Sequence, residues 1–371
     1  MPIISHIGLS RIELLRQHLN TEKIDALLVS NHNNILYLTG FKGLSTDERE
    51  AWVFITKKNT YLITDGRYVD SIQKSELAIK MQELTPENPL KKILSTIINN
   101  EQINIIGFEA EDLSYHEYTY FKKHVHTTFQ ETRNIIGLLR IQKDKHEIEM
   151  VKKSCEVADQ CLKEIFQTIS PGQTEKEIAF TIEFWLKKHD SDLAFSPIVA
   201  IDQNSAIPHY DTKSNGTTKV TAGSIILIDF GALYNNYMSD ITRMIFVGKP
   251  LDEYIKAYEI VQKAQEQALK LLETKSEYKD IDKATRNFIT QNNYPSYPHS
   301  TGHGLGLEVH ENPKIAPKSK DIIKPGHVVT IEPGVYVKGK FGIRIEDTLY
   351  INDQKQPEIL TNTPKELLII H

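Results

Sequence analysis

The chain has little cysteine and no long apolar run, and both shortages narrow the classes of protein to which it can belong. Only two cysteines, Cys155 and Cys161, occur in 371 residues, and their spacing fits neither a zinc site nor a disulfide framework. No stretch of about 18 apolar residues is present, so we expect no membrane span. The N-terminus lacks a basic segment followed by an apolar core of signal-peptide length. We therefore expect a soluble, cytoplasmic protein with reduced thiols.

An excess of charge of one sign is also missing. The chain carries 44 Lys and Arg residues against 49 Asp and Glu residues, a formal net charge of −5. Basic residues never run beyond adjacent pairs. Because a nucleic-acid interface needs a basic patch or stripe, this pattern argues against nucleic acid as the main partner.

The length suggests two domains, and the patterns of the two parts differ. The first part alternates helix and strand and is predicted to be an α/β domain. We expect a boundary near 131–136, and we assign residues 1–132 to the first domain and residues 133–371 to the second. The predicted elements of the first domain are helices over 11–19, 90–99 and 115–123, and strands over 26–30, 51–56, 60–64 and 103–108.

The second domain combines long helices with antiparallel strands, which favours an α+β arrangement over a doubly wound sheet. A helix is predicted from Lys145 to about Ile169, where Ser170-Pro171-Gly172 ends it. Thr174 followed by Glu177 resembles a capping box and starts the next helix, which continues to about residue 188. Two further helices are predicted near 252–272 and 277–291.

Four carboxylates in the second domain are arranged as two pairs, each in a predicted hairpin. Asp229 ends an apolar strand, and Asp240 follows the turn Leu233-Tyr-Asn-Asn236. If the two strands pair symmetrically about this turn, the two aspartates lie directly opposite each other, with their Cβ atoms about 4.5–5.5 Å apart. Aspartate is also common beside turns, so this pair alone would not indicate a site.

The second pair is Glu332 and Glu346. Their midpoint is Gly339, in the predicted turn Lys338-Gly-Lys340. Both hairpins therefore present matched carboxylates, which repel each other unless positive charge neutralises them.

Two divalent cations would balance the four carboxylates, with neutral His303 as a fifth ligand. A set of oxygen ligands with one imidazole suits manganese, cobalt, iron or zinc. Two such cations would lie about 3.5–4 Å apart, as in hydrolytic two-metal sites. The glycines around His303 could instead form a phosphate loop, but the spacing is not Gly-x-Gly-x-x-Gly and no Gly-Lys-Ser/Thr follows.

At these residues the chain resembles the pita-bread metallopeptidases, in the branch of aminopeptidase P and prolidase. The matching segments lie in both predicted domains and keep the family's order, so the resemblance covers essentially the whole chain; they are 34–41, 64–68, 228–232, 237–243, 301–311, 330–336 and 342–347. The resemblance implies an α+β fold, with a C-terminal pita-bread (creatinase/aminopeptidase) catalytic domain and an N-terminal α/β creatinase-like accessory domain. Creatinases share both domains but lack the metal ligands.

The resemblance also implies roles for individual residues. Two divalent metal ions, with manganese the first choice and cobalt, zinc or iron as alternatives, would be held by Asp229, Asp240, His303, Glu332 and Glu346. A metal-bridging hydroxide would attack the scissile carbonyl, and Glu332 would take and pass on the proton. The catalytic set would be His209, His310, Glu332 and Arg344, and the substrate-binding set would be His209, His310, Arg344 and Tyr336.

The activity that this resemblance implies is that of an Xaa-Pro aminopeptidase, which releases an N-terminal residue that precedes proline. The substrates would be proline-containing peptides, and the enzyme would be a homodimer by analogy with the family. The alternative is a prolidase restricted to Xaa-Pro dipeptides, and no motif separates the two. A more remote alternative is a non-catalytic binding protein on the same fold, although such proteins lose ligands that are intact here.

Overall fold

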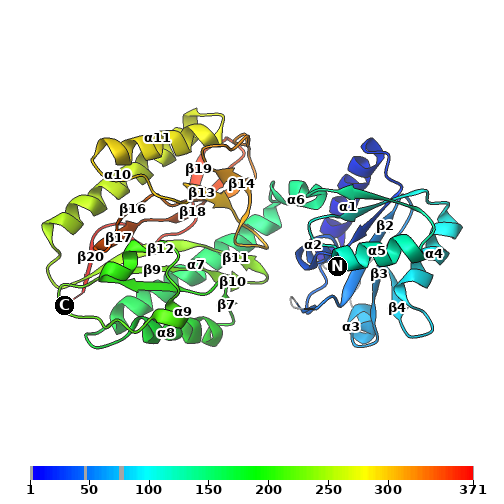
Figure 1. Ribbon diagram of the computed structural model, residues 1–371, viewed down its shortest axis with the longest axis horizontal. Helices are drawn as coiled ribbons and strands as arrows, with labels where there is room; N and C mark the ends of the chain where they lie inside the picture. Colours follow the sequence, from blue (N-terminus) through cyan, green and yellow to red (C-terminus); the bar gives the residue numbers. More distant parts are fainter. Residues whose placement is uncertain (1–2, 46–47, 75–78, 371) are drawn as a thin grey trace. The chain divides into compact units, whose positions relative to one another are not determined.

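The computed structural model describes residues 3–45, 48–74 and 79–370 of the chain (Figure 1). The chain divides into two compact units, Met1–Arg140 and Ile141–His371. The elements of the first unit are α1 (Ile3–Thr21), β1 (Ala26–Val29), α2 (His32–Thr39), β2 (Ala51–Thr56), β3 (Thr60–Asp65), α3 (Val69–Lys74), β4 (Lys80–Leu84), α4 (Leu90–Glu101), β5 (Ile105–Glu109), α5 (Tyr115–His124), β6 (Thr128–Thr132) and α6 (Ile135–Arg140).

The first unit is built on a mixed sheet with the strand order β4-β3-β2-β1-β5-β6. The central strands β1 and β2 are buried along their whole length, because helices cover both faces of the sheet. Helices α4 and α5 pack on one face through residues such as Leu94 and Phe121, while α1 and α2 contact β2. This arrangement confirms the predicted α/β class of the first domain.

Helix α6 decides where the first unit ends. It contacts α1 and α2, and the division between the units follows it, at residues 140 and 141. The boundary predicted from the sequence, between residues 132 and 133, precedes this short helix.

The second unit contains the remaining elements, and its four long helices start and end close to the predicted residues. Helices α7 and α8 both begin with a capping box, Asp144 with Glu147 and Thr174 with Glu177. The elements of this unit are α7 (Lys145–Thr168), α8 (Glu175–Lys188), β7 (Asp192–Leu193), β8 (Ile198–Ile201), η1 (Asp202–Ala206), α9 (Thr212–Asn215), β9 (Ile225–Phe230), β10 (Ala232–Tyr234), β11 (Tyr237–Met238), β12 (Ile241–Val247), α10 (Asp252–Thr274), α11 (Tyr278–Gln291), β13 (Gly302–Gly304), β14 (Glu311–Ile315), β15 (Val328–Ile331), β16 (Gly334–Val337), β17 (Phe341–Arg344), β18 (Asp347–Ile351), β19 (Pro357–Ile359) and β20 (Leu368–Ile370).

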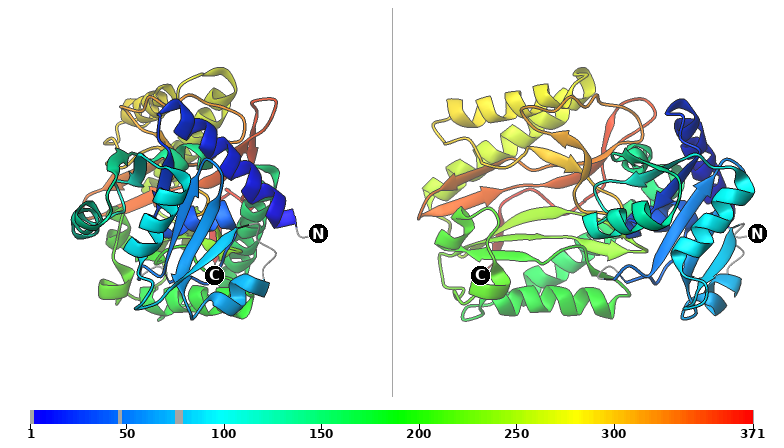
Figure 2. Two further views of the ribbon diagram at one scale, coloured as in Figure 1. Left: turned by 90° about the vertical axis from the view of Figure 1, so that its right-hand side faces the viewer. Right: turned by 45° about the vertical axis from the view of Figure 1, so that its right-hand side comes forward.

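The strands of the second unit form two larger sheets, with orders β20-β12-β9-β8 and β14-β13-β15-β18-β19, a small sheet with the order β11-β10-β7, and the hairpin β16-β17. An isolated bridge between Thr242 and Glu346 connects the first sheet to the segment between β17 and β18. Helices α7 and α8 lie on one side of the strands, and α10 and α11 lie on the other (Figures 1 and 2). The strands therefore form the interior layer of this unit.

Successive side chains of the buried strand β9 point alternately into two hydrophobic cores, one on each face of the sheet. Ile226, Ile228 and Phe230 pack in the core that contains α7 and α8, whereas Ile225 and Leu227 pack in the core that contains α10. Asp229 has the parity of Ile225 and Leu227, so it projects away from α7 and α8. The fold thereby turns this carboxylate toward the second sheet.

The membrane prediction can be compared with the helices directly. Across residues 3–45, 48–74 and 79–370, no helix combines the length and the apolar composition that crossing a membrane requires.

Candidate metal centre and its pocket

Asp229 and Asp240 lie on one hairpin, but not directly opposite each other as the sequence suggested. In the antiparallel pair β9-β12, Asp229 faces Thr242 across the ladder. Asp240 lies two residues before Thr242, so it occupies a diagonal position on the same face. The reason is the turn. Asn235 and Asn236 both have positive φ and form its centre, which shifts the register while keeping both carboxylates on one face.

Glu332 and Glu346 lie between two antiparallel strand pairs that share one register. Ile331 pairs with Asp347 in β15-β18, and Gly334 pairs with Arg344 in β16-β17. The predicted turn at Gly339 is present, with φ of 71°. The two glutamates are therefore flanked on both sides by paired residues and sit across from each other in the gap between the ladders.

His303 lies in β13 and directs one ring nitrogen at the carboxylates. Its Nδ1 lies 3.1 Å from the carbonyl oxygen of Gly304. A carbonyl can only accept, so Nδ1 carries the proton and the neutral ring has a bare lone pair on Nε2. That Nε2 lies 3.6 Å from Asp240 Oδ2 and 3.4 Å from Glu332 Oε1. Three acceptors thus face one another, an arrangement that a cation would stabilise.

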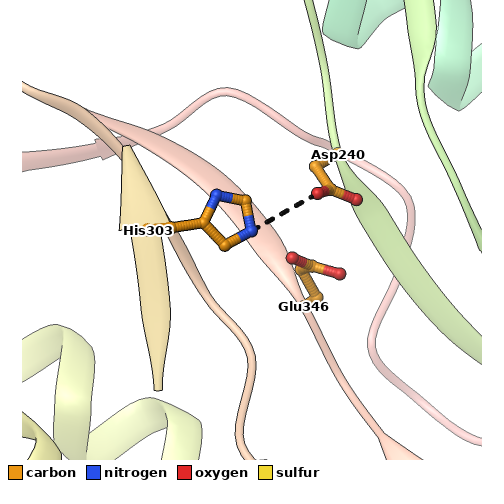
Figure 3. A group of neighbouring side chains, drawn as sticks. All are labelled: Asp240, His303 and Glu346. Carbon is orange, nitrogen blue, oxygen red and sulfur yellow. Dashed lines mark ion pairs between the residues drawn. The ribbon is translucent and has the colours of Figure 1, made fainter. Parts of the chain in front are cut away.

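The carboxylates of Asp240 and Glu346 and the imidazole of His303 converge on one point (Figure 3). Each offers a ligand atom, and these atoms lie within 4.8 Å of one another. All five predicted ligands line one pocket of about 510 Å³. The other residues that line it are Phe195, Ser196, Ile198, His209, His299, Ser300, Val309, His310, Lys314 and Arg344.

Arg344 connects this cluster to its surroundings through all three guanidinium nitrogens. Nη2 donates to Asp229, Nη1 donates to the hydroxyl of Tyr336 at 2.8 Å and the carbonyl of Pro208 at 3.2 Å, and Nε donates to Thr242 at 3.0 Å. Thr242 in turn donates to Glu346 Oε2 at 2.6 Å. Arg344 and Thr242 therefore fix the orientation of one carboxylate from each hairpin.

Tyr336 and His299 continue this network behind the pocket. The Tyr336 hydroxyl accepts from Arg344 and lies 2.9 Å from His299 Nε2. His299 Nδ1 lies 2.8 Å from the Ser300 carbonyl, so Nδ1 carries the proton and the tyrosine donates to Nε2. Tyr336 was predicted to bind substrate, but it is buried behind Arg344 rather than among the described residues that line the pocket.

His209 and His310 lie at the open side of the pocket. Both are exposed, and the His310 ring stacks edge-on against His303 with centroids 4.5 Å apart. Burial, and then the proximity of His209, lowers the pKa of His310. The structure thus places every predicted site residue in or directly behind one pocket.

Among the residues that sequence reasoning missed are two with a chemical bearing on the site, Thr242 and Lys314. Thr242 is found only once the β9-β12 register is known. Lys314 pairs directly with His303 across β13-β14, so the two side chains share a face. The spacing from His303 to Lys314 could have suggested a hairpin. Because the register shifts between His303 and Gly304, however, the spacing alone does not show that Lys314 lies opposite His303.

Burial and mutual repulsion disfavour the charged form of three clustered acids. Burial, followed by the charge of Glu346, raises the pKa of Asp240 and of Glu332 well above the ordinary values. Burial, followed by the charge of Asp229, raises the pKa of Glu346 to about 8. Burial lowers the pKa of His303 to about 3, which keeps its ring neutral. Neutral imidazole is the form that binds a metal.

The cluster fits divalent cations on grounds of hydrogen bonding as well as charge. In the described part of the chain, the Oδ1 atoms of Asp229 and Asp240 are buried and have no hydrogen-bond partner. A buried carboxylate oxygen without a partner is costly. Hard or borderline divalent cations bind such oxygens together with an imidazole.

We expect the metal-free protein, kept in EDTA, to lose stability as the pH rises from about 5 to 8. The folded state holds a proton on Glu346 up to a pKa of about 8, whereas the unfolded chain releases it near 4.5. The stabilisation that this proton gives the folded state is complete below about pH 4.5. It is lost as the pH rises toward about 8, by about 1.4 kcal/mol for each pH unit per proton. Urea unfolding in EDTA at a series of pH values measures the slope.

Manganese should remove most of this pH dependence, because the cation replaces the protons between the carboxylates. A free energy of unfolding that stays flat or rises between pH 5 and 8 without metal would show that the cluster is not strained by its own charge.

The comparisons with known proteins show the family of the chain. The family described as "Metallopeptidase family M24" matches residues 149–353, and the "Creatinase/Prolidase N-terminal domain" matches residues 11–142. The Xaa-Pro dipeptidase of Pyrococcus furiosus is 34% identical over 367 residues, which cover 96% of this chain and 99% of that protein.

Two solved structures are similar over nearly the whole chain. The Xaa-Pro dipeptidase from Bacillus anthracis matches with a TM-score of 0.90 at 33% identity, covering 98% of this chain and 100% of that one. The X-Pro aminopeptidase from Thermotoga maritima matches with a TM-score of 0.85 at 34% identity, covering 94% and 98%. The chain therefore belongs to metallopeptidase family M24, in the branch that joins a creatinase-type N-terminal domain to a pita-bread catalytic domain.

Proposed function

We propose that this metallopeptidase is an Xaa-Pro dipeptidase, which hydrolyses the bond between the two residues of a dipeptide ending in proline. The sequence alone favoured an Xaa-Pro aminopeptidase and kept the dipeptidase as its alternative. The names of similar proteins support the alternative better, since those from Pyrococcus furiosus and Bacillus anthracis are both called Xaa-Pro dipeptidases.

The choice of a dipeptidase over an aminopeptidase rests on the position of Lys314. Its side chain is exposed in the wall of the pocket, and among the described residues its ammonium group has no ion-pair partner. The other cation of the pocket wall, Arg344, is buried and donates to Asp229, Tyr336, Pro208 and Thr242. Lys314 is thus the cation that is available for an anionic group of the substrate.

A dipeptide presents such a group close to the bond that is cleaved. Its two residues span about 7 Å when extended, so the C-terminal carboxylate stays inside a pocket of this size. In a longer peptide that position is a neutral amide, and the carboxylate lies farther along the chain. An unpaired lysine opposite His303 therefore favours a substrate that ends at proline.

The metal ligands in this proposal are five side chains that line the pocket, those of Asp229, Asp240, His303, Glu332 and Glu346. Two divalent cations, when bound, would supply a water acidified to near neutral pH and would polarise the scissile carbonyl. The oxygen-rich set keeps manganese as the first choice, with cobalt, zinc and iron as alternatives.

The remaining residues would bind the peptide and handle the proton. His310 and His209, at the open side of the pocket, would donate to the oxygen that becomes negative during hydrolysis. Glu332 would accept the proton of the attacking water and pass it to the leaving nitrogen. Arg344 would hold Asp229 and the backbone at Pro208, the residue before His209, in one fixed arrangement. A homodimer in the cytoplasm stays a prediction from the family resemblance.

The test compares three substrates: an Xaa-Pro dipeptide, the same dipeptide with a C-terminal amide, and an Xaa-Pro-Xaa tripeptide. We expect the manganese-loaded enzyme to prefer the dipeptide and to lose activity in EDTA. Lys314→Met should lower kcat/KM for the dipeptide by about 10- to 100-fold, the value of a hydrogen bond to a charged group. Hydrolysis of the amide should change little.

Lys318→Met is the matched control, because Lys318 is an exposed lysine of the same segment that does not line the pocket. It should leave all three rates unchanged. Faster cleavage of the tripeptide by the wild type, or an equal loss on dipeptide and amide in Lys314→Met, would return the assignment to an aminopeptidase.

A further inference from the structure

A buried ion pair lies beneath the loop that carries His310. The Nζ atom of Lys143 lies 2.9 Å from Glu311 Oε2, and the two side chains are only 1% and 7% exposed. Lys143 belongs to the segment before α7, where its backbone N–H donates to the Gly326 carbonyl. Lysine and glutamate are almost never buried this completely unless they are paired.

Glu311 also organises the loop from residue 305 to residue 311. Its second oxygen accepts the backbone N–H of Glu308 at 3.1 Å. The N–H of Gly306 donates to the Glu308 carbonyl at 3.0 Å, and the Gly306 carbonyl accepts from Met238 at 2.8 Å. The loop is therefore a tight turn that is fastened from inside by one carboxylate. His303 and His310 lie on either side of it, with their rings 4.5 Å apart.

Gly306 shows how closely the loop fits around the pair. A Cβ atom on this residue would lie 3.0 Å from Lys143 Cε and 3.1 Å from both carboxylate oxygens of Glu311. Its φ is not in the left-handed region, so the backbone itself would accept alanine. A methyl group here would therefore press on the ion pair and require its atoms to shift by a few tenths of an ångström.

We propose that Lys143 and Glu311 are positioning residues that hold His310 in its place over the metal centre. The inference rests on the proposed function, in which His310 donates to the substrate oxygen. A buried ion pair adds little net stability over apolar residues of equal volume, but it fixes geometry through directional, charge-assisted bonds. This pair joins the segment before α7 to the residue that follows His310.

The variants that test this role are Lys143→Met, Glu311→Gln, their combination, and Gly306→Ala. We expect each to lower kcat on the dipeptide by about 10- to 100-fold, the usual effect of losing a supporting partner. KM and bound manganese should stay within about threefold of the wild type. The combined variant matters most, because it leaves no unpaired buried charge and should fold even where a single variant does not.

Lys152→Met is the control for charge removal. Lys152 pairs with Glu358 at 2.8 Å, and both side chains are well exposed. This variant should keep the wild-type kcat, since an exposed pair contributes little.

Combination with His310→Ala separates positioning from a general loss of structure. If the pair acts through His310, adding Lys143→Met and Glu311→Gln to His310→Ala should lower kcat no further. The proposal is overturned if the two effects multiply, or if manganese binding falls in step with kcat.

Hydrogen exchange supplies a measurement that does not depend on the substrate. The amides of residues 305–311 should exchange at least about tenfold faster in the combined variant, with the rest of the second unit unchanged. Unchanged exchange in this segment would refute the positioning role, even if the dipeptide proved to be the wrong substrate. Faster exchange in an enzyme that ignores dipeptides would leave the positioning role standing and reject only the proposed substrate.

Discussion

Replacing Asp240 with asparagine is expected to lower kcat/KM by at least about 10³-fold while making the metal-free protein more stable. Asp240 faces both His303 and Glu346, and its Oδ1 has no hydrogen-bond partner within the described residues. Asparagine keeps the size of the side chain but removes the charge that would bind the cations. Loss of one such ligand removes several kcal/mol of transition-state stabilisation, at about 1.4 kcal/mol for each tenfold in rate.

The gain in stability has the opposite origin. Without metal, burial and the charges of Glu346 and Asp229 oppose ionisation of Asp240. An uncharged side chain relieves that repulsion, so the variant in EDTA should unfold at a higher temperature than the wild type at pH 8. The difference should shrink toward pH 5, where the wild-type carboxyls already hold their protons. A variant that is less stable than the wild type at pH 8 would contradict this account of the cluster.

Asp159→Asn provides the matched control. Asp159 accepts hydrogen bonds from Asn362 and Thr363, which anchor the C-terminal segment away from the pocket lining. Its loss should cost about 1–3 kcal/mol of stability with little change in kcat/KM. Two Asp→Asn changes in one unit should therefore move stability in opposite directions, and only one should abolish turnover.

Local signals predicted the four long helices of the second unit well, whereas α1 begins at Ile3 rather than at residue 11 and the short helices α3, α6 and α9 were not predicted. Thr174 with Glu177 predicted the start of α8, and the capping box is present there. Helix α7 begins at Lys145 as predicted, and the structure shows a second capping box there, Asp144 with Glu147. Helix α2 escaped prediction, because Ile35-Leu-Tyr-Leu38 is apolar without helical spacing. Its boundaries become clear only from the Asn31 cap and the left-handed Gly40.

Register limited what could be predicted of the site. Gly339 fixed the pairing around Glu332 and Glu346, because a single glycine with positive φ marks the centre of that turn. The first hairpin offered four candidate turn residues, and only the structure shows that Asn235 and Asn236 form its centre. The position of the turn centre decides which residue lies opposite Asp229. The sequence analysis placed Asp240 there, whereas the structure places Thr242 there.

The sequence did not fix which individual side chains of distant segments contact each other. Arg344 reaches Asp229, which is 115 residues away in the sequence, and Lys143 reaches Glu311, which is 168 residues away. No periodicity or spacing rule connects such positions, because their distance depends on how the two sheets meet. The ligands and Arg344 were found from local motifs, whereas the partners of Arg344 and the contribution of Thr242 required the fold.

Substitution of Arg344 gives the clearest test of how much the residues that orient the metal ligands contribute. Arg344→Met should lower kcat/KM by about 10³-fold and, unlike Asp240→Asn, should destabilise the metal-free protein by about 3–5 kcal/mol. The guanidinium is the buried positive charge beside Asp229, and it also donates to Tyr336, Thr242 and the Pro208 carbonyl. Its removal leaves one buried carboxylate uncompensated and a hydroxyl and a carbonyl each short of a donor.

Arg344→Lys separates charge from geometry. An ammonium group keeps the positive charge but cannot present donors to Asp229, Tyr336 and Thr242 at once, so the substitution is not conservative at this site. We expect Arg344→Lys to recover most of the lost stability and little of the lost kcat/KM. Activity within about threefold of the wild type would mean that charge alone is sufficient and that the fork of hydrogen bonds does not orient Asp229. Equal losses of stability in the two variants would instead show that the lysine ammonium does not reach Asp229, in which case the methionine variant alone measures the contribution of the buried charge.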